Sequence, residues 1–210
     1  MLEYPKAVTT YLGEIGADET MDNQQGTVTQ AELGWLAGIL EGEGSLTMNV
    51  RKKSWKGWQG IGVDMTLSIA NTDGAIIERA RSILVRLTGA EPKIYESPAT
   101  AIYRENGEKY QNPGKTMLYC SVGRMAHILE TLKQLTPHIV GEKAARARLI
   151  TQYIERRIAR KGDHTKDGSA WMDETDWSTV AEFYRLKKRP IPPEVLGLLN
   201  EHEQARLKAV

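Results

Sequence analysis

The sequence has a single cysteine, Cys120, among 210 residues. A lone cysteine excludes an intramolecular disulfide and any metal site built from several cysteines. No apolar run approaches the ~20 residues that a transmembrane helix needs, so no membrane partner is expected. Residues 1–17 lack the basic start and the apolar segment of a secretory signal peptide. We therefore expect a protein of the cytoplasm, or of an organelle matrix, that is not secreted.

Net charge is also small, +1, but the charged residues are unevenly distributed. Residues 1–44 hold one Lys or Arg and eight Asp or Glu, residues 45–161 hold 20 and 10, and residues 162–210 hold seven and nine. A basic middle segment is typical of proteins that bind polyanions, although a solvated basic face without a partner gives the same count. We expect a poorly ordered acidic leader at 1–28, a central domain at 29–161 and a helical extension at 162–210.

Residues 29–45, TQAELGWLAGILEGEGS, predict a short helix with well-marked ends. Thr29 and Glu32 have the spacing of a capping box, in which each residue satisfies a backbone amide of the other. Gly42 and Gly44 are suited to the left-handed backbone that often ends a helix. The helix is apolar on most of its circumference, so it is expected to be buried in a core or against a partner.

Two features of this helix are costly. Glycine recurs at Gly34, Gly38 and Gly42, and each interior glycine costs about 1 kcal/mol relative to alanine. Such a stripe is favourable if another backbone approaches closely. Glu41 and Glu43 stand at the C-terminal end, where the helix dipole disfavours each carboxylate by roughly 0.3–1 kcal/mol. A positive partner, such as a divalent cation, would offset this cost.

Two strands of alternating polarity follow, at 45–53 and 61–70, and predict an antiparallel hairpin across a loop at 54–60. One face of the hairpin is polar and basic. Its residues are Thr47, Asn49, Arg51, Lys53, Thr66 and Ser68. A two-stranded ribbon with mixed hydrogen-bonding groups fits the DNA major groove, where base edges differ in donors and acceptors. A plain solvated sheet face is the alternative interpretation.

The remaining pattern completes an α+β fold. It predicts a helix at 76–87, an interrupted strand at 93–96 and 103–105, a strand at 116–122, a helix at 124–135 and a long basic helix at 141–161. The element order is therefore α-β-β-α-β-β-α. Further helices are expected at 171–186 and 194–208 in the C-terminal extension. The basic run at 187–189 lies between them, where it is suited either to phosphate contact or to a solvated helix end.

Residues 36–44, LAGILEGEG, resemble the LAGLIDADG motif of homing endonucleases, from which they differ by conservative changes. The element order is also similar to the core of that family, a curved antiparallel sheet under helices, and the resemblance covers roughly residues 29–160. It implies a homing endonuclease that hydrolyses phosphodiester bonds of double-stranded DNA. It also implies Mg²⁺ or Mn²⁺ as cofactor, with Ca²⁺ expected to bind without supporting cleavage.

The resemblance assigns roles to particular residues. Glu43 occupies the acidic eighth position and is expected to bind the metal, together with the carbonyl of Gly42. Asn71, at the end of the second strand, is expected to lie near the attacking water. Lys143, at the start of the last core helix, is expected to assist that water or to stabilise phosphate charge. A strand-end turn for Asn71 and an exposed helix start for Lys143 are the structural alternatives.

Only one copy of the motif is present, so the resemblance implies a homodimer on a long pseudo-palindromic target. The expected interface residues are Gly34, Trp35, Ala37 and Gly38. The alternative is a nucleic-acid-binding protein of the same fold that does not cleave, either an intron RNA maturase or a DNA-binding regulator. Intron RNA therefore stays open as a partner. The acid at Glu43 favours cleavage, because relatives that lose cleavage often lose that acid.

Overall fold

The computed structural model describes residues 26–55, 58–97, 102–103, 109–110, 116–160 and 172–208. Most of the expected leader, residues 1–25, therefore lies outside the described residues. None of the helices in the described ranges is long and apolar enough to span a membrane.

The central part of the chain has the predicted α+β order. Its elements are α1 (Gln30–Glu43), β1 (Gly44–Trp55), β2 (Trp58–Asn71), α2 (Gly74–Thr88), β3 (Lys93–Ser97), β6 (Met117–Val122), α3 (Met125–Leu135), the 3₁₀ turn η2 (Thr136–His138) and α4 (Gly141–Ala159). Four of the strands form an antiparallel sheet in the order β1-β2-β6-β3. The expected α-β-β-α-β-β-α core is confirmed.

The expected interrupted strand at 93–96 and 103–105 is wrong in its second half. β4 (Ile102–Tyr103) does not continue β3 but pairs with β5 (Lys109–Tyr110) in a separate two-stranded sheet. Pro98 lies between β3 and β4 in the sequence and has no backbone N–H to donate to a ladder. The second part of the segment therefore leaves the main sheet.

The β1–β2 hairpin is longer than predicted. Its ladder runs from the pair Gly44↔Ile69 to the pair Trp55↔Trp58, so the expected loop at 54–60 is wrong. Tryptophan and isoleucine have high β-propensity, which favours continued pairing over a loop. The connection is left with two residues, 56 and 57, which is the commonest length for a hairpin; those two lie outside the described residues.

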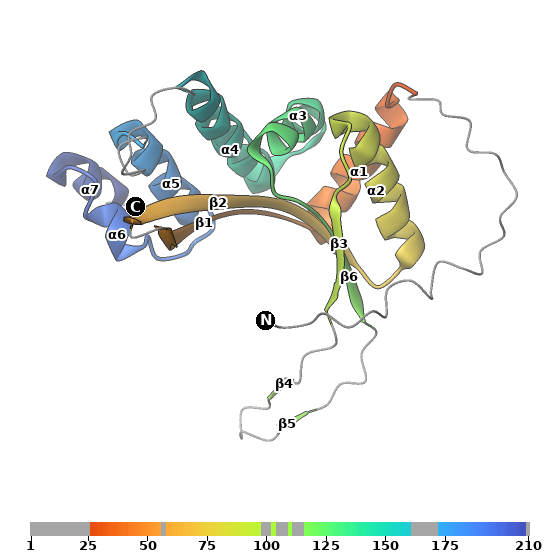
Figure 1. Cartoon of the computed structure of the whole chain (residues 1–210), viewed down its shortest axis with the longest axis horizontal. Coiled ribbons are helices and arrows are strands. Elements are labelled where there is room, and N and C mark those ends of the chain that lie inside the picture. The colour runs from red at the N-terminus through yellow and green to blue at the C-terminus, as the bar shows by residue number, and fades with distance from the viewer. Residues whose placement is uncertain are drawn as a thin grey trace, which may run out of the picture.

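The helices cover one face of the curved sheet (Figure 1). Side chains of alternate strand residues point into the core between sheet and helices and are almost fully buried: Leu46, Met48, Met65, Leu67 and Ile69. Leu36 and Leu40 of α1 are also fully buried and belong to the same core. Each buried aliphatic side chain contributes about 1.5–3 kcal/mol relative to exposure. Packing therefore fixes which sheet face remains open.

Helix α1 begins with the predicted capping box. The Thr29 hydroxyl accepts a hydrogen bond from the Glu32 N–H at 3.2 Å, and the Thr29 N–H donates to the Glu32 carboxylate at 2.9 Å. That carboxylate also binds the Arg86 guanidinium of α2 at 2.5 Å. Its hydrogen bonds to Arg86 and to Thr29 hold the pKa of Glu32 at about 2. The first turn of α1 is thereby tied to α2.

The end of α1 differs from the expectation. Neither Gly42 nor Gly44 has a left-handed backbone, and Gly44 is extended, with φ −94° and ψ 156°. The chain passes directly from helix into strand. Gly44 is required for a different reason: a Cβ there would lie 2.4–2.7 Å from atoms of Leu40, which is a steric clash. Glycine permits the close approach at this junction.

The C-terminal extension contributes α5 (Glu174–Leu186), α6 (Pro193–Leu196) and α7 (Glu201–Lys208). The expected single helix at 194–208 is wrong, because Gly197 and Asn200 separate α6 from α7 and the Asn200 side chain accepts a hydrogen bond from the Glu203 N–H at 2.8 Å. In α5, Trp177, Val180 and Phe183 are buried in the same core as the central elements. The extension is therefore continuous with the central fold.

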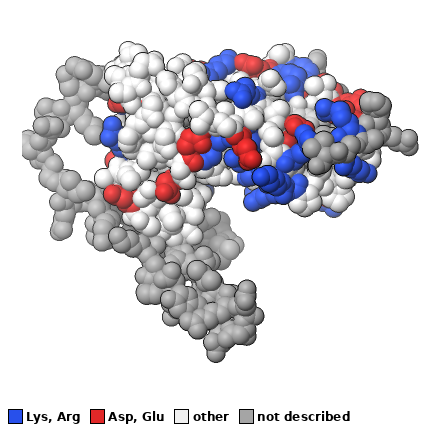
Figure 2. Space-filling view, turned by 180° about the vertical axis from the view of Figure 1, so that it is seen from behind, with Lys and Arg blue, Asp and Glu red and all other residues white. Residues whose placement is uncertain are grey.

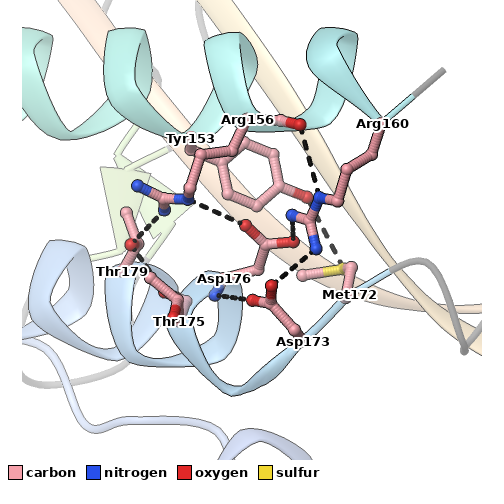
Figure 3. Close-up of polar contacts among 8 residues, drawn as sticks. All are labelled: Tyr153, Arg156, Arg160, Met172, Asp173, Thr175, Asp176 and Thr179. Atoms are coloured by element: carbon pink, nitrogen blue, oxygen red, sulfur yellow. Dashed lines mark hydrogen bonds and ion pairs between the residues drawn. The ribbon is translucent and has the colours of Figure 1, made fainter.

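A buried ionic network attaches α5 to α4 (Figure 3). Asp176 of α5 is 0% exposed, and its carboxylate binds two arginines of α4. Arg156 lies 3.2 Å from one carboxylate oxygen, and Arg160 binds the other. Arg160 also reaches Asp173 at 2.7 Å, while Arg156 donates to the Thr179 hydroxyl at 2.6 Å. These contacts fix α5 beside the sheet.

The end of α5 covers the free edge of β1. The Tyr184 hydroxyl accepts a hydrogen bond from the Val50 N–H at 3.3 Å, and the Lys187 ammonium lies 3.4 Å from the Leu46 carbonyl. An uncovered edge strand presents unpaired backbone groups to other chains. The extension thus protects the strand that follows the LAGLIDADG-like helix.

Candidate active site and nucleic-acid interface

The C-terminus of α1 is held by a lysine from a distant helix. The Lys143 ammonium, near the start of α4, donates to the carbonyls of Leu40, Glu41 and Gly44 at 2.5, 2.7 and 2.9 Å. The last carbonyls of a helix lack partners within it and carry its negative dipole end. Burial is the main factor that lowers the pKa of Lys143, while Glu41 opposes this shift. Within one chain, Lys143 is therefore a positive partner of the kind expected at this helix end.

This geometry changes the expected role of Lys143. Its ammonium is half-buried against three backbone carbonyls, so it fixes the turn from α1 into β1 rather than standing free at an exposed helix start. Because Glu43 lies inside that turn, the Lys143 contacts position the backbone that carries the predicted catalytic acid.

The two acids of the motif have different surroundings. The Glu41 carboxylate accepts a hydrogen bond from the Val140 N–H at 2.9 Å and so links α1 to the start of α4. Glu43 is exposed, and within the described ranges no hydrogen bond or ion pair involves its carboxylate. Glu41 therefore has a structural contact, whereas Glu43 is available for a ligand, in agreement with the choice made from the motif.

The oxygen atoms around Glu43 suit a hard divalent cation. Gly42 is exposed, and its carbonyl is not among the three oxygens that Lys143 binds. A free carboxylate beside a backbone carbonyl, at the negative end of a helix, offers the ligands that Mg²⁺ and Mn²⁺ prefer. The described residues contain no group of three or more His, Cys, Asp or Glu side chains that could hold a metal ion. Water, DNA phosphate or a second copy must supply the other ligands.

Asn71 lies at the same end of the ribbon as Glu43. It is the last residue of β2, two positions beyond Ile69, which pairs with Gly44, and this separation is about 7 Å along the strand. Its side-chain oxygen accepts a hydrogen bond from the Asp73 N–H at 2.9 Å, just before α2. The structure thus confirms the turn role named as its alternative. The amide NH₂ of Asn71 donates no hydrogen bond to any of the described residues, so it is available as a donor.

The polar residues of the hairpin share the open face of the sheet. In the ladder, Thr47 pairs with Thr66 and Ser45 pairs with Ser68, between buried residues that face the core. Asn49 and Arg51 continue this row along β1. The common face predicted for Thr47, Asn49, Arg51, Thr66 and Ser68 is confirmed; we call it the reading face. Lys53 pairs in register with Gly60, but its side chain lies outside the described part of the chain.

Sequence reasoning missed three residues of the same face. Asp64 pairs with Asn49, and its carboxylate lies 3.3 Å from the guanidinium of Arg51. Tyr95 of β3 and Tyr119 of β6 stack with ring centroids 4.8 Å apart. Tyr119 lies beside Ala70 of β2, a pairing between residues 49 positions apart that no local pattern reveals. The alternation around the buried Cys120 was the one available signal for Tyr119.

The expected dimer residues of α1 are placed unequally. Gly34 and Gly38 are exposed, and a Cβ on either would meet no atom within 4 Å. Trp35 is partly buried, and the Arg79 guanidinium lies 4.4 Å from its ring centroid. Ala37 is only 1% exposed, because it packs in the core of its own chain. Ala37 is therefore a core residue and does not contribute to the exposed glycine face.

Comparison with known proteins identifies the fold. No protein-family model and no curated protein sequence matches the chain. Among solved structures, the homing endonuclease I-CvuI, in complex with its target and calcium, matches at 19% identity and a TM-score of 0.52, over 86% of this chain and 97% of that one. The LAGLIDADG homing endonuclease I-GzeII, in complex with its DNA target, matches at 13% identity and a TM-score of 0.50, over 74% of this chain and 44% of that one.

A third match is I-SmaMI bound to uncleaved DNA with calcium ions, at 16% identity and a TM-score of 0.50, over 87% of this chain and 50% of that one. The chain thus spans nearly all of I-CvuI but half or less of I-GzeII and I-SmaMI. It has the fold of the LAGLIDADG homing endonucleases, as the motif in α1 predicted.

Proposed function

We propose that this chain is a site-specific DNA endonuclease that requires a divalent metal and acts as a homodimer on a pseudo-palindromic duplex. The observation that carries this proposal is the position of Glu43. It is an exposed carboxylate without a partner among the described residues, at the junction where the motif helix becomes the first strand of the reading face. A DNA strand lying on that face would pass this acid.

Hydrolysis of a phosphodiester needs an attacking water, stabilisation of charge on the phosphate and help for the leaving oxygen. A divalent cation held by Glu43 and the Gly42 carbonyl would stabilise that charge. Lys143 acts by fixing the α1–β1 turn, so that the Glu43 side chain and the Gly42 carbonyl keep one arrangement. The amide NH₂ of Asn71, at the same end of the ribbon, would orient the attacking water by a hydrogen bond.

Recognition is assigned to the reading face. Hydroxyl, amide and guanidinium groups recur there at alternate positions of β1 and β2, which suits donors and acceptors on base edges in the major groove. Asp64 adds an acceptor for the amino group of cytosine or adenine beside the donor Arg51. Contacts to phosphate position the duplex, and contacts to base edges select its sequence.

The single acid and the exposed face of α1 support the homodimer. Cutting both strands needs two acids, and the 210 residues of this sequence hold one motif. Gly34, Gly38 and Gly42 form a stripe on which a Cβ would meet nothing within 4 Å. Interior glycines destabilise a helix by about 1 kcal/mol each, a cost that close packing against a second α1 would offset.

Recognition can be tested by selecting bound duplexes from a random library in the presence of Ca²⁺, which is expected to permit binding without cleavage. We expect enrichment of one long site whose two halves are related by a two-fold axis, since a symmetric dimer reads each half with the same reading face. Sequencing of the retained duplexes checks this. Dimeric site-specific recognition would be refuted if no sequence were enriched, or if the enriched site lacked two halves related by a two-fold axis.

The dimer can be tested with Gly38→Leu. A Cβ at Gly38 meets no atom of its own chain within 4 Å, and leucine favours the helix over glycine, so the thermal transition should be kept or raised. Across a two-fold contact the same side chain would hold the helices apart. We expect self-association to weaken by about 2 kcal/mol or more, roughly 30-fold in Kd, measured by sedimentation equilibrium.

Gln152→Leu is the matched control, because it adds an apolar side chain at an exposed position of α4. It should associate like the wild type. A wild-type protein that is monomeric at concentrations where it cuts both strands would exclude the proposed dimer.

A further inference from the structure

The basic run Lys187, Lys188 and Arg189 has a defined place in the fold. It forms the turn that follows α5 and lies along the outer edge of β1, where Lys187 contacts the Leu46 carbonyl at 3.4 Å. Leu46 is three residues beyond Glu43, or about 10 Å along an extended chain. The run is therefore adjacent to the candidate active site, although it is 140 residues away in sequence.

Two cations of α4 join this run. Lys188 lies 3.6 Å from the carboxylate of Glu142, the neighbour of Lys143, and Arg146 donates to the Glu142 carbonyl at 3.4 Å, so the run lies beside the start of α4. Burial and then the charges of Arg189, Arg146 and Lys143 lower the pKa of Lys187, in agreement with this arrangement. Seen from behind the view of Figure 1, lysine and arginine side chains gather over the half of the molecule that holds the later helices, whereas the other half carries few (Figure 2). Like charges held together repel one another, so this arrangement is favourable only when an anion approaches.

Nearby acids do not neutralise the group. Glu142 lies 3.6 Å from Lys188, in a pair whose side chains are 84% and 62% exposed and therefore weakly coupled. The Glu41 carboxylate keeps its negative charge and raises the pKa of Lys143, so these two acids offset only part of the charge of the five cations.

The backbone of Lys188 gives independent evidence. It is the one non-glycine residue with a positive φ, 52°, within the described ranges. A left-handed backbone costs about 1–2 kcal/mol for a residue with a Cβ, and glycine would avoid that cost. Lysine at this position presents a charged side chain that glycine would lack.

The group is continuous with the reading face. A shallow hollow is lined by Lys187 and Arg189 together with Asn49 of the reading face and by Met48, Phe183 and Tyr184. A strand of DNA that lies on Asn49 would thus have its backbone beside these cations.

We propose that Lys143, Arg146, Lys187, Lys188 and Arg189 form a basic shelf, of which the last four bind phosphates of the DNA backbone within roughly three nucleotides of the cleaved bond. The three N–H groups of Lys143 all donate to backbone carbonyls, so Lys143 contributes its charge alone. This inference rests on the proposed function, because it assumes that duplex DNA lies on the reading face. Lys143 and Lys187 anchor the shelf to backbone carbonyls, and Lys188 and Arg189 are its exposed contacts. The shelf adds affinity without sequence preference, since phosphates are the same at every base pair.

The double variant Lys188→Gly/Arg189→Gln tests the shelf without removing an anchoring contact. Each lost phosphate contact should reduce the slope of log K against log salt by about 0.9, and should weaken binding roughly fivefold at 0.15 M salt. We therefore expect binding about 30-fold weaker, with equal loss on the selected site and on an unrelated duplex. The melting temperature should stay the same or rise by up to ~4 °C, because glycine relieves the left-handed residue.

Lys133→Gln is the matched charge control. Lys133 is exposed on α3, and its ammonium lies 3.1 Å from the carboxylate of Glu155 in α4. Glu155 is twelve residues from Lys143 along α4, a distance of about 18 Å, so this ion pair lies away from the shelf. The control variant should bind DNA like the wild type. The shelf would be overturned if the double variant kept the wild-type affinity and salt slope. It would also be overturned if Lys133→Gln lost as much affinity as the double variant, or if the double variant lost affinity for the selected site alone. Absence of duplex binding by the wild type would overturn the proposed function and the shelf together.

Discussion

Replacing Glu43 by glutamine should reduce DNA cleavage by roughly 10³-fold or more, which corresponds to about 4 kcal/mol of transition-state stabilisation. Glutamine keeps the size of the side chain but removes the negative charge that a hard divalent cation needs from its ligand. Binding should stay within about threefold of wild type, because within the described residues no hydrogen bond or ion pair joins the Glu43 side chain to the reading face. Cleavage of a selected duplex with Mg²⁺ and binding with Ca²⁺ measure the two effects separately.

Glu41→Gln is the control within the same motif. The Glu41 side chain accepts a hydrogen bond from the Val140 N–H, and a glutamine oxygen can accept the same bond. Its cleavage rate should fall by less than the roughly 10–100-fold that loss of a contact supporting a metal ligand causes, because glutamine keeps the hydrogen bond from Val140. Undiminished cleavage by Glu43→Gln, or an equal loss in both variants, would remove the catalytic assignment of Glu43.

The largest stability effect is expected at Asp176. Its carboxylate is 0% exposed and binds both Arg156 and Arg160 across the α4–α5 contact (Figure 3). Asp176→Ala leaves two cations without their buried partner, which costs 3–5 kcal/mol in comparable pairs. The arginines are 32% and 28% exposed and can recover some hydration, so we expect about 3 kcal/mol. The melting temperature should fall by roughly 6–12 °C, measured by calorimetry.

Glu155→Gln is the control, because it removes an acid from an ion pair on the surface, between α4 and α3. Its partner Lys133 and Glu155 itself are about half exposed, at 49% and 47%. Such pairs contribute at most about 1 kcal/mol, so the melting temperature should change little. A similar decrease in both variants would show that the Asp176 network does not hold α5 in place.

Local chemistry predicted the parts of the fold that depend on neighbouring residues. The capping box of Thr29 and Glu32, the common face of Thr47 and Thr66, and the helix after Asp73 all follow from short-range spacing and all are present. The motif in α1 predicts Glu43 as the catalytic acid, and within the described part of the chain no hydrogen bond or ion pair involves its carboxylate.

Contacts between distant residues could not be predicted in this way. Lys143 reaches carbonyls about 100 positions earlier, so part of the negative charge at the end of α1 is offset by a side chain that no local pattern predicts. Tyr119 joins the reading face only because β6 pairs with β2. Ala37 is predicted at the dimer surface because it is a small residue beside Gly38 in the motif, and only the packed core shows that its side chain points inward.

The most direct measurement is the sequencing of ends produced from a random duplex library by the wild-type protein with Mg²⁺, with Glu43→Gln in parallel. We expect paired ends on both strands at one pseudo-palindromic site in the wild-type reaction, and none above background in the variant or with EDTA. Ends at unrelated sequences, or equal ends from both proteins, would contradict a site-specific endonuclease centred on Glu43.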